Sequence, residues 1–388
     1  MGLGLTARDG ASHAAMAQDE VDIPAPADFH CHLRQGDMMK LVTPHVSLGG
    51  MQLAYVMPNL SPPITTTEQA IRYRAELQAL APEIDFMMTL FLAPALTPDE
   101  IRKAHKAGIS GVKSYPRGVT TGSEGGVESY EKYYDVFEAM QECDMVLNLH
   151  GEVPSSEASG ITVLNAEPAF HRHLEELHAR FPNLRIVLEH ATTKASVDIV
   201  NRLGPTVACT ITAHHLALVV DDWAGNNLHF CKPVAKTYED RRALREVIAS
   251  GNRKFFLGSD SAPHPSLSKL PLLSQDAQVA PNACAAGVYT SPILLPLLAH
   301  LFETVEPRIP LERLPDFAGG FGRSFYARPA SQSAHSVRLR RVNASSGVST
   351  SGQGRVPVSY DGQSEALGQI RVIPYFASKT LNFAIASS

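Results

Sequence analysis

The sequence has no long apolar run, no closely spaced cysteine pair and no excess of basic residues. Its apolar stretches fall well short of the ~20 residues that a membrane-spanning helix needs, so no membrane partner is expected. Lysine and arginine total 34 against 39 aspartates and glutamates, and this net charge of -5 gives no reason to expect nucleic-acid binding. The five cysteines include no C-x-x-C pair, which argues against a disulfide framework and for a reducing, cytoplasmic compartment.

Residues 1–20 are small and polar, and they lack the apolar core of a secretory signal. Gly2 and Thr6 match the short myristoylation pattern M-G-x-x-x-[ST], but a disordered leader is the favoured interpretation. For the rest of the chain we expect a catalytic barrel over 21–330, a flexible polar excursion over 331–370, and a tail over 371–388 that packs on the barrel.

Short apolar runs rich in β-forming residues alternate with longer stretches of helical pattern. This order predicts an α/β fold with a parallel sheet, and eight strands is the number that closes a (β/α)8 TIM barrel. A doubly wound sheet fits the strand count as well, but the polar residues at the strand ends favour the barrel. Thr97 and Glu100 have the form of a capping box. The predicted strands are 28–30, 53–57, 85–92, 111–113, 145–150, 185–190, 207–212 and 255–259, and the predicted helices are 67–80, 97–107, 129–142, 167–180, 194–202, 238–250 and 291–302.

Several predicted strands end on side chains that can bind a metal or carry a proton. The C-terminal ends of all barrel strands meet at one mouth, where active sites lie, so these side chains are expected to face a common centre. Positions i and i+2 of a strand point to the same side, so His30 and His32 can reach one ion while Cys31 packs the other way. The other strand-end residues are Lys113, His150, His190 and Asp260.

Four histidines and a carboxylate form a nitrogen-and-oxygen ligand set that suits Zn²⁺, and a set this rich can hold two metals. A single strand-end histidine is more often a packed or solvated residue, but that explanation does not account for all of these positions together. Lys113 fits only if it loses its positive charge, for example as a carbamate formed with CO2; pairing with a nearby acid is the alternative. His214 and His215, after the seventh predicted strand, receive no role.

Taken in order, the motifs around these residues resemble the dihydroorotase family, in particular its compact, single-function type found in bacteria and fungi. The resemblance runs from about 28 to 326, and D-S-A-P-H and M-P-N-L separate this type from hydantoinases and allantoinases. The motifs are H-x-H-x-R from His30 to Arg34, M-P-N ending at Asn59, K-x-Y-P from Lys113, H-G-E from His150, E-H-x-T-T around His190, and G-S-D-S-A-P-H ending at His264.

The resemblance implies a homodimeric enzyme that interconverts N-carbamoyl-L-aspartate and L-dihydroorotate, a step of pyrimidine biosynthesis, on two Zn²⁺ ions. It implies that Asp260 is both a metal ligand and the proton shuttle. The implied ligands are His30, His32 and Asp260 for one ion, His150 and His190 for the other, and a carbamylated Lys113 as the bridge. The implied substrate contacts are Arg34, Asn59, His264, the backbone at Ala286 and Gly287, and Thr120 and Thr121 in a mobile loop over 117–126.

Two other functions stay open at this point. A related cyclic-amide hydrolase of the hydantoinase or allantoinase kind would use the same barrel, although Arg34, Asn59 and His264 together favour an anionic substrate. A catalytically inactive, dihydroorotase-like scaffold is the alternative from another class, but every expected ligand is present. The segment 230–236 carries lysines where many bacterial members have apolar residues, and in this it resembles the fungal version of the family. Its Lys232 either approaches the substrate or lies on the surface.

Overall fold

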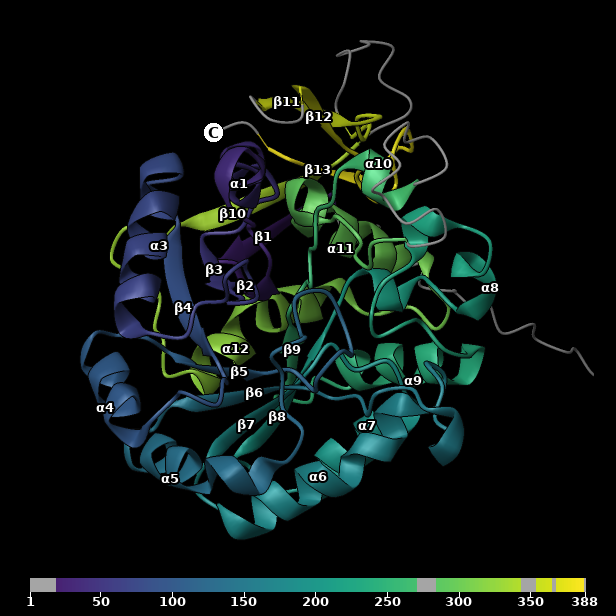
Figure 1. Ribbon diagram of the computed structural model, residues 1–388. Coiled ribbons are helices and arrows are strands. Elements are labelled where there is room, and N and C mark those ends of the chain that lie inside the picture. Colours follow the sequence, from purple (N-terminus) through teal and green to yellow (C-terminus); the bar gives the residue numbers. More distant parts are fainter. Residues whose placement is uncertain (1–18, 271–283, 343–353, 365–367, 387–388) are drawn as a thin grey trace, which may run out of the picture.

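The computed structural model describes residues 19–270, 284–342, 354–364 and 368–386, so almost all of the expected leader lies outside it. Strands β2 to β9 form one parallel sheet of eight strands in sequence order, and the helices lie around its outside (Figure 1). The predicted (β/α)8 barrel is therefore confirmed. Its strands are β2 (Ala27–Cys31), β3 (Leu53–Val56), β4 (Asp85–Phe91), β5 (Gly111–Ser114), β6 (Val146–His150), β7 (Arg185–Glu189), β8 (Val207–Ile211) and β9 (Phe255–Leu257).

Polar contacts join β2 to the segment that follows β9 and so close the barrel at its C-terminal end. The Asp260 N–H donates to the carbonyl of His30 at 2.8 Å. The buried carboxylate of Asp28 accepts from the backbone N–H and the hydroxyl of Ser259, at 2.8 Å and 2.6 Å. These bonds hold the first and last groups of predicted ligands side by side.

An apolar plug fills the barrel interior below this end. Phe29 stacks on Tyr326, with ring centroids 5.2 Å apart, and meets Phe256 edge-on at 5.4 Å. Tyr55 belongs to the same buried cluster, and its hydroxyl donates to the Asn148 side chain at 3.0 Å. The interior is thus a packed core, as in other barrels of this kind, and only the C-terminal mouth is open for chemistry.

Threonine side chains cap the starts of four helices, α3, α4, α7 and α9, but the pair Thr97 and Glu100 does not form the predicted capping box. Thr66 and Gln69 form a full capping box at α3. Thr97 does accept from the Glu100 N–H, but the Glu100 carboxylate bonds the Thr67 N–H at 2.6 Å instead of returning to Thr97, so the capping box predicted there is wrong.

No described helix is both long and apolar enough to cross a membrane. The helices are α1 (Gly36–Val42), α2 (His45–Leu48), α3 (Thr67–Leu80), α4 (Pro98–Lys106), α5 (Tyr134–Glu142), α6 (Ala166–Arg180), α7 (Lys194–Arg202), α8 (Val220–Trp223), α9 (Tyr238–Ala249), α10 (Ser266–Lys269), α11 (Leu294–Thr304) and α12 (Phe321–Phe325).

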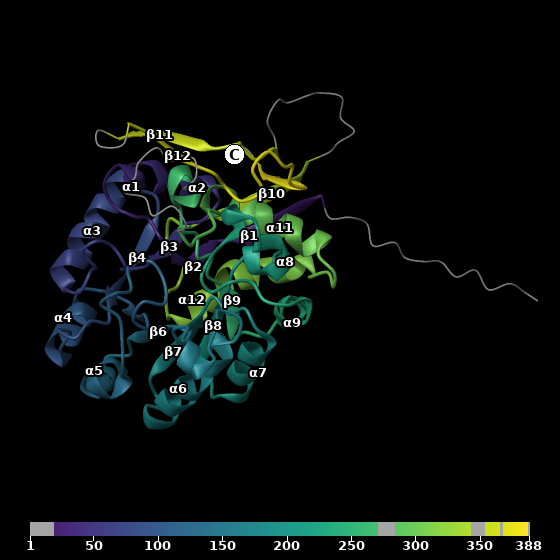
Figure 2. The ribbon, with the colours of Figure 1, turned by 45° about the vertical axis from the view of Figure 1, so that its right-hand side comes forward.

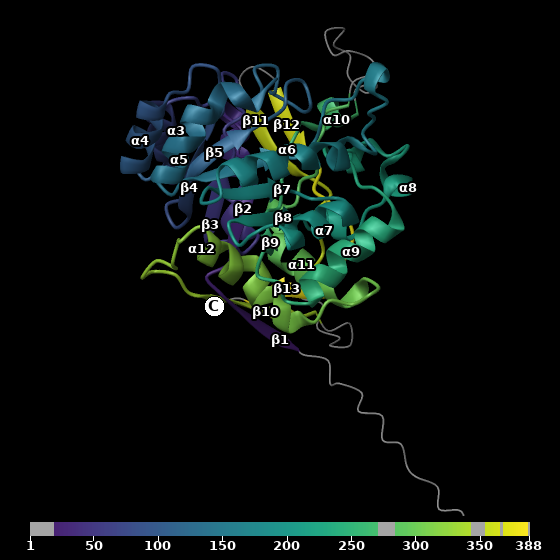
Figure 3. The same ribbon diagram turned by 90° about the horizontal axis from the view of Figure 1, so that it is seen from below.

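A second, antiparallel sheet joins distant parts of the chain in the order β1 (Glu20–Pro24), β10 (Ser336–Arg341) and β13 (Phe383–Ile385). Figure 3 shows it beside α11. A separate hairpin, β11 (Tyr360–Ser364) and β12 (Gly368–Val372), lies beside α1 (Figure 2).

The segment 331–370, expected to be a flexible excursion, therefore contains β10, β11 and the start of β12. In β10 the buried Val337 and Leu339 alternate with the exposed Ser336, Arg338 and Arg340, so the average polarity of the segment hid the alternation of a strand. Residues 343–353 and 365–367 of this excursion lie outside the described residues.

Candidate active site

The predicted metal ligands meet at the open mouth of the barrel. Asp260 Oδ1 lies 3.0 Å from His32 Nε2 and 3.5 Å from His30 Nε2. The ring of His190 lies between those of His30 and His150, with centroid distances of 5.0 Å and 4.7 Å. All of these side chains are buried. Residues from four separate strand ends are thus brought to one centre, as the sequence predicted from their positions.

Among the predicted metal ligands, three polar atoms are buried without a hydrogen-bond partner among the described residues: His30 Nε2, His190 Nδ1 and Lys113 Nζ. Leaving a buried polar group unpaired costs about 1–3 kcal/mol, so native proteins rarely keep several such atoms together. A metal ion accepts donation from neutral imidazole nitrogens and would satisfy both histidines. The residues present therefore fit a metal centre, and Lys113 fits it once its ammonium is replaced by an anionic group.

Two buried carboxylates orient the histidines. Glu189 accepts from His30 Nδ1 at 2.7 Å, and Asn148 and Thr210 donate to the same carboxylate, each at 2.6 Å. Glu152 accepts from His150 Nε2 at 2.8 Å. Each bond fixes which ring nitrogen is left for the centre, as carboxylates behind metal-bound histidines commonly do.

Neither carboxylate received a role from the sequence. The available signal was the acid beside each histidine in the motifs E-H, at Glu189, and H-G-E, at Glu152.

Burial sets the protonation of these side chains. It lowers the pKa of His32 to about 4 and that of His190 well below its usual value, so both are in the neutral, ligating form near pH 7. It also lowers the pKa of Lys113 to about 8. Burial would raise the pKa of Asp260, but the hydrogen bond with His32 and the charge of His30 outweigh it and hold that pKa below its usual value. Asp260 is therefore an anion at the centre.

Three residues of the predicted site have a left-handed backbone, with φ of 61° at Arg34, 43° at His190 and 46° at Asp260. Residues other than glycine rarely adopt this region, and such strain is concentrated at functional sites. Surrounding bonds hold it in place: the His190 N–H donates to the Thr210 hydroxyl at 2.7 Å, and Tyr73 donates to the Arg34 carbonyl. The strained backbone turns these side chains into the mouth.

Most of the predicted substrate contacts lie around a cavity that five of the predicted metal ligands also line. Arg34 donates through Nε to Pro263 O at 2.8 Å, and its Nη2 lies 3.0 Å from His264 Nε2. Asn59 donates to Thr121 O at 3.1 Å, so the predicted mobile loop contacts this residue. The predicted contacts at this cavity are Arg34, Asn59, Thr120, Thr121 and Ala286, and a wider hollow beside it is lined by Arg34, Asn59, Thr121 and His264.

Lys232 also lines the cavity of the predicted metal ligands, so it approaches the site rather than lying on the outer surface. Gly287 is placed differently from the other predicted contacts. Its N–H donates to Phe230 O at 3.0 Å, and its carbonyl accepts from Lys269 at 2.9 Å. Both of its backbone groups are therefore used within the protein.

His214 and His215 form a second buried group with Cys231, within which the ligand atoms lie within 4.8 Å of one another. Both ring nitrogens of His215 already have partners, the Thr212 hydroxyl at 2.8 Å and Pro233 O at 3.1 Å. Both ring nitrogens of His214 are buried without a hydrogen-bond partner among the described residues, so the unpaired nitrogens of this group belong to one residue. In the first centre they belong to His30, His190 and Lys113, which makes it the better metal site.

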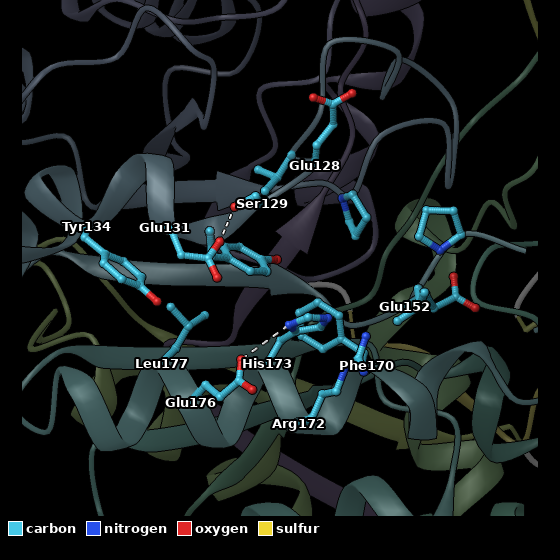
Figure 4. Close-up of a pocket in the computed structure, with 15 residues that line it drawn as sticks. Glu128, Ser129, Glu131, Tyr134, Glu152, Phe170, Arg172, His173, Glu176 and Leu177 are labelled. Atoms are coloured by element: carbon cyan, nitrogen blue, oxygen red, sulfur yellow. Dashed lines mark hydrogen bonds and ion pairs between the residues drawn. The ribbon is translucent and has the colours of Figure 1, made fainter. Parts of the chain in front are cut away.

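A second cavity, of about 460 Å³, lies beside Glu152, the carboxylate that accepts from His150 (Figure 4). Glu152 forms part of its wall, and Glu176 and His173, which pair at 3.7 Å, line it as well. Glu152 contacts the predicted ligand His150, whereas Glu176 of the same wall contacts none of the predicted ligands.

We expect Glu152→Gln to lower the affinity for metal about 10- to 100-fold, the usual effect of losing a carboxylate behind a metal-bound histidine. The measurement is a zinc-binding isotherm of the metal-free protein. Glu176→Gln is the matched control, since it changes the same cavity without contacting a predicted ligand, and its isotherm should overlay that of the parent. Equal affinities for all three proteins would show that Glu152 does not support the centre.

Comparisons with known proteins agree with this geometry. A family model described as "Amidohydrolase" matches residues 28–272. The chain is 50% identical over 398 residues to a dihydroorotase of Mycosarcoma maydis, covering 96% of this chain and 100% of that protein. It is 44% identical to the dihydroorotase of Saccharomyces cerevisiae, over 82% of this chain and 88% of that protein.

A crystal structure of dihydroorotase from Saccharomyces cerevisiae in complex with 5-fluoroorotic acid superposes with a TM-score of 0.83 at 40% identity, covering 95% of this chain and 99% of that one. The resemblance drawn from the short motifs is thereby confirmed over almost the whole chain. The protein is a metal-dependent cyclic amidohydrolase and belongs to the dihydroorotase family.

Proposed function

We propose that this chain catalyses the reversible hydrolysis of L-dihydroorotate to N-carbamoyl-L-aspartate, a step of de novo pyrimidine biosynthesis. The observation that carries the proposal is the convergence of unpaired, buried nitrogens of His30, His190 and Lys113 beside a cavity lined by Arg34. The unpaired nitrogens suit hydrolysis assisted by metal ions, and the guanidinium of Arg34 suits an anionic substrate. The dihydroorotase relatives support the identity of that substrate.

Two zinc ions are the proposed cofactors. When bound, they supply a water of lowered pKa and polarise the amide carbonyl that is attacked. The burial of Lys113 favours the neutral amine, which is the form that adds to CO2 to give the carbamate. The proposed ligands are His30, His32 and Asp260 for one ion, His150 and His190 for the other, and carbamylated Lys113 as the bridge.

Asp260 is the proposed general base and acid. Its carboxylate, held beside His30 and His32, takes a proton from the attacking water as the water oxygen bonds to the ring carbonyl carbon. It then gives the proton to the ring nitrogen as the carbon–nitrogen bond breaks. In the direction of ring closure the same carboxylate performs these transfers in reverse.

Arg34, with Asn59 and His264, is the proposed holder of the substrate carboxylate. A guanidinium presents a planar fork of donors that matches a carboxylate, which a lysine does not. Pro263 O fixes its Nε, so the outer nitrogens face the mouth. Thr120 and Thr121 line the same cavity, from where their loop excludes bulk water.

The test of this function is the ultraviolet absorbance of L-dihydroorotate incubated with the purified protein, with and without prior chelation. We expect absorbance loss that the chelator abolishes and that added zinc restores. No turnover by protein with two metals per chain would point to a different cyclic amide. No turnover and no metal would point to an inactive scaffold.

We further propose a cytoplasmic homodimer, as the resemblance implies. Gel filtration should then give a mass near twice the 42.0 kDa of one chain.

A further inference from the structure

Lys269 at the end of α10 has an ammonium group bonded by three backbone carbonyls. The side chain is only 5% exposed. Nζ donates to Phe230 O at 2.8 Å, to Ala285 O at 2.9 Å and to Gly287 O at 2.9 Å. One charged group therefore ties the segment after β8 to the segment 285–287 beside the cavity.

This ammonium has no carboxylate partner within the part of the chain that the structure describes. Taking an ammonium out of water is unfavourable unless hydrogen bonds replace its hydration, and here three carbonyl oxygens occupy all three of its donors. An uncharged side chain would fill the same space without that penalty. The three hydrogen bonds of the ammonium therefore have a role besides packing, which is to fix the backbone that carries these carbonyls.

Two of the three carbonyls that Lys269 bonds, those of Ala285 and Gly287, belong to a segment whose other backbone groups are almost all hydrogen-bonded. The Ala285 N–H donates to Ser268 O at 3.0 Å, the Gly287 N–H donates to Phe230 O at 3.0 Å, and Ala286 O lies 3.0 Å from His264 Nε2. Among the described residues, the Ala286 N–H alone in this segment has no hydrogen-bond partner. Ala286 lines the cavity that holds the predicted metal ligands.

We propose that Lys269 is a positioning residue that holds the Ala286 N–H toward the cavity as a hydrogen-bond donor for the anionic substrate. The proposal rests on the function proposed above. Lys269 does not touch the substrate itself: its three bonds fix the backbone on both sides of Ala286. Its positive charge acts on His264, which lies 3.0 Å from Arg34, and adds positive potential where a substrate carboxylate is held.

The test compares Lys269→Met with Lys236→Met in the zinc-loaded enzyme. Lys236 is a matched control because it is also buried and also donates to a backbone carbonyl, Val234 O at 2.7 Å, but does not contact 285–287. We expect Lys269→Met to raise KM for dihydroorotate about tenfold or more while kcat changes less than about threefold, because a binding donor is displaced and the chemistry is retained. Lys236→Met should leave KM within about twofold.

Hydrogen exchange measured by mass spectrometry gives a second readout that needs no turnover. The amides of 284–288 should exchange faster in Lys269→Met and at the parent rate in Lys236→Met. A lower melting temperature with unchanged KM and unchanged exchange would make Lys269 merely structural and would overturn the proposal. If the parent does not hydrolyse dihydroorotate, the proposed function fails, and the exchange rates alone still decide whether Lys269 positions this segment.

Lys269→Arg decides the question if Lys269→Met does not fold. It keeps the charge, but a planar guanidinium cannot direct its donors at three converging carbonyls as an ammonium does. A rise in KM of about threefold, with faster exchange at 284–288, supports positioning by Lys269. Parent values for both KM and exchange contradict it.

Discussion

Asp260→Asn is expected to lower kcat for dihydroorotate about 10²- to 10⁴-fold, the range that a positioned acid–base group contributes. The amide keeps the size of the side chain and an oxygen that can face His30 and His32. It cannot take up and return a proton, so both directions of the reaction should slow together. The measurement is kcat in each direction, with the metal content of every sample determined in parallel.

The metal content separates the two roles proposed for Asp260. A variant that keeps two metals and loses activity has lost the proton shuttle, whereas a variant that loses metal has lost a ligand. Asp198→Asn is a suitable control because Asp198 forms an exposed ion pair with Lys194 on α7. Parental activity in a fully loaded Asp260→Asn enzyme would refute the assigned role.

Lys113→Met is expected to abolish activity and to reduce bound zinc from two ions per chain to one or none. Lys113 is fully buried, and its amine has no hydrogen-bond partner among the described residues. With its pKa lowered to about 8, roughly a tenth of the amine is neutral at pH 7 and available to CO2. Zinc uptake by the metal-free parent should therefore increase when bicarbonate is added to CO2-depleted buffer, and the variant should show no such increase.

Lys236→Met again provides the control, since it removes a buried lysine that lies outside the metal centre. After loading with ¹³C-bicarbonate, the parent and this control should show a carbamate carbon resonance that Lys113→Met lacks. A parent enzyme that binds two zinc ions regardless of bicarbonate, without that resonance, would exclude the carbamate bridge.

The barrel and the centre of its mouth could be predicted because both follow from local sequence patterns. Strands buried on both faces are short apolar runs, and a parallel order puts all of their C-terminal ends together. Once the barrel is assumed, the positions of His30, His150, His190 and Asp260 at strand ends determine that they meet. No contact between distant segments had to be known in advance.

The residues that orient this centre could not be predicted in the same way. Glu189 and Glu152 act through hydrogen bonds to ring nitrogens. Their places beside predicted ligands in the motifs E-H and H-G-E are a signal, but adjacency in the sequence does not show whether an acid bonds a ring or lies on the surface. Lys269 is less predictable still, because its partners are backbone carbonyls, which every residue has. Similarly, the carboxylate of Glu100 caps a neighbouring helix rather than its own, a choice made by tertiary packing.

The β1–β10 pairing also has a consequence for synthesis of the chain on the ribosome. β1 emerges early, but its partner follows roughly 310 residues later, so β1 waits roughly 15–60 s at ordinary elongation rates. While β1 is unpaired, its large apolar side chains are Val21 and Ile23. They alternate with Glu20 and Asp22, and these acids discourage pairing with other nascent chains. Arg338 and Arg340 then arrive opposite Asp22 and Glu20, so attraction between opposite charges can select the correct register as the last part of the fold assembles.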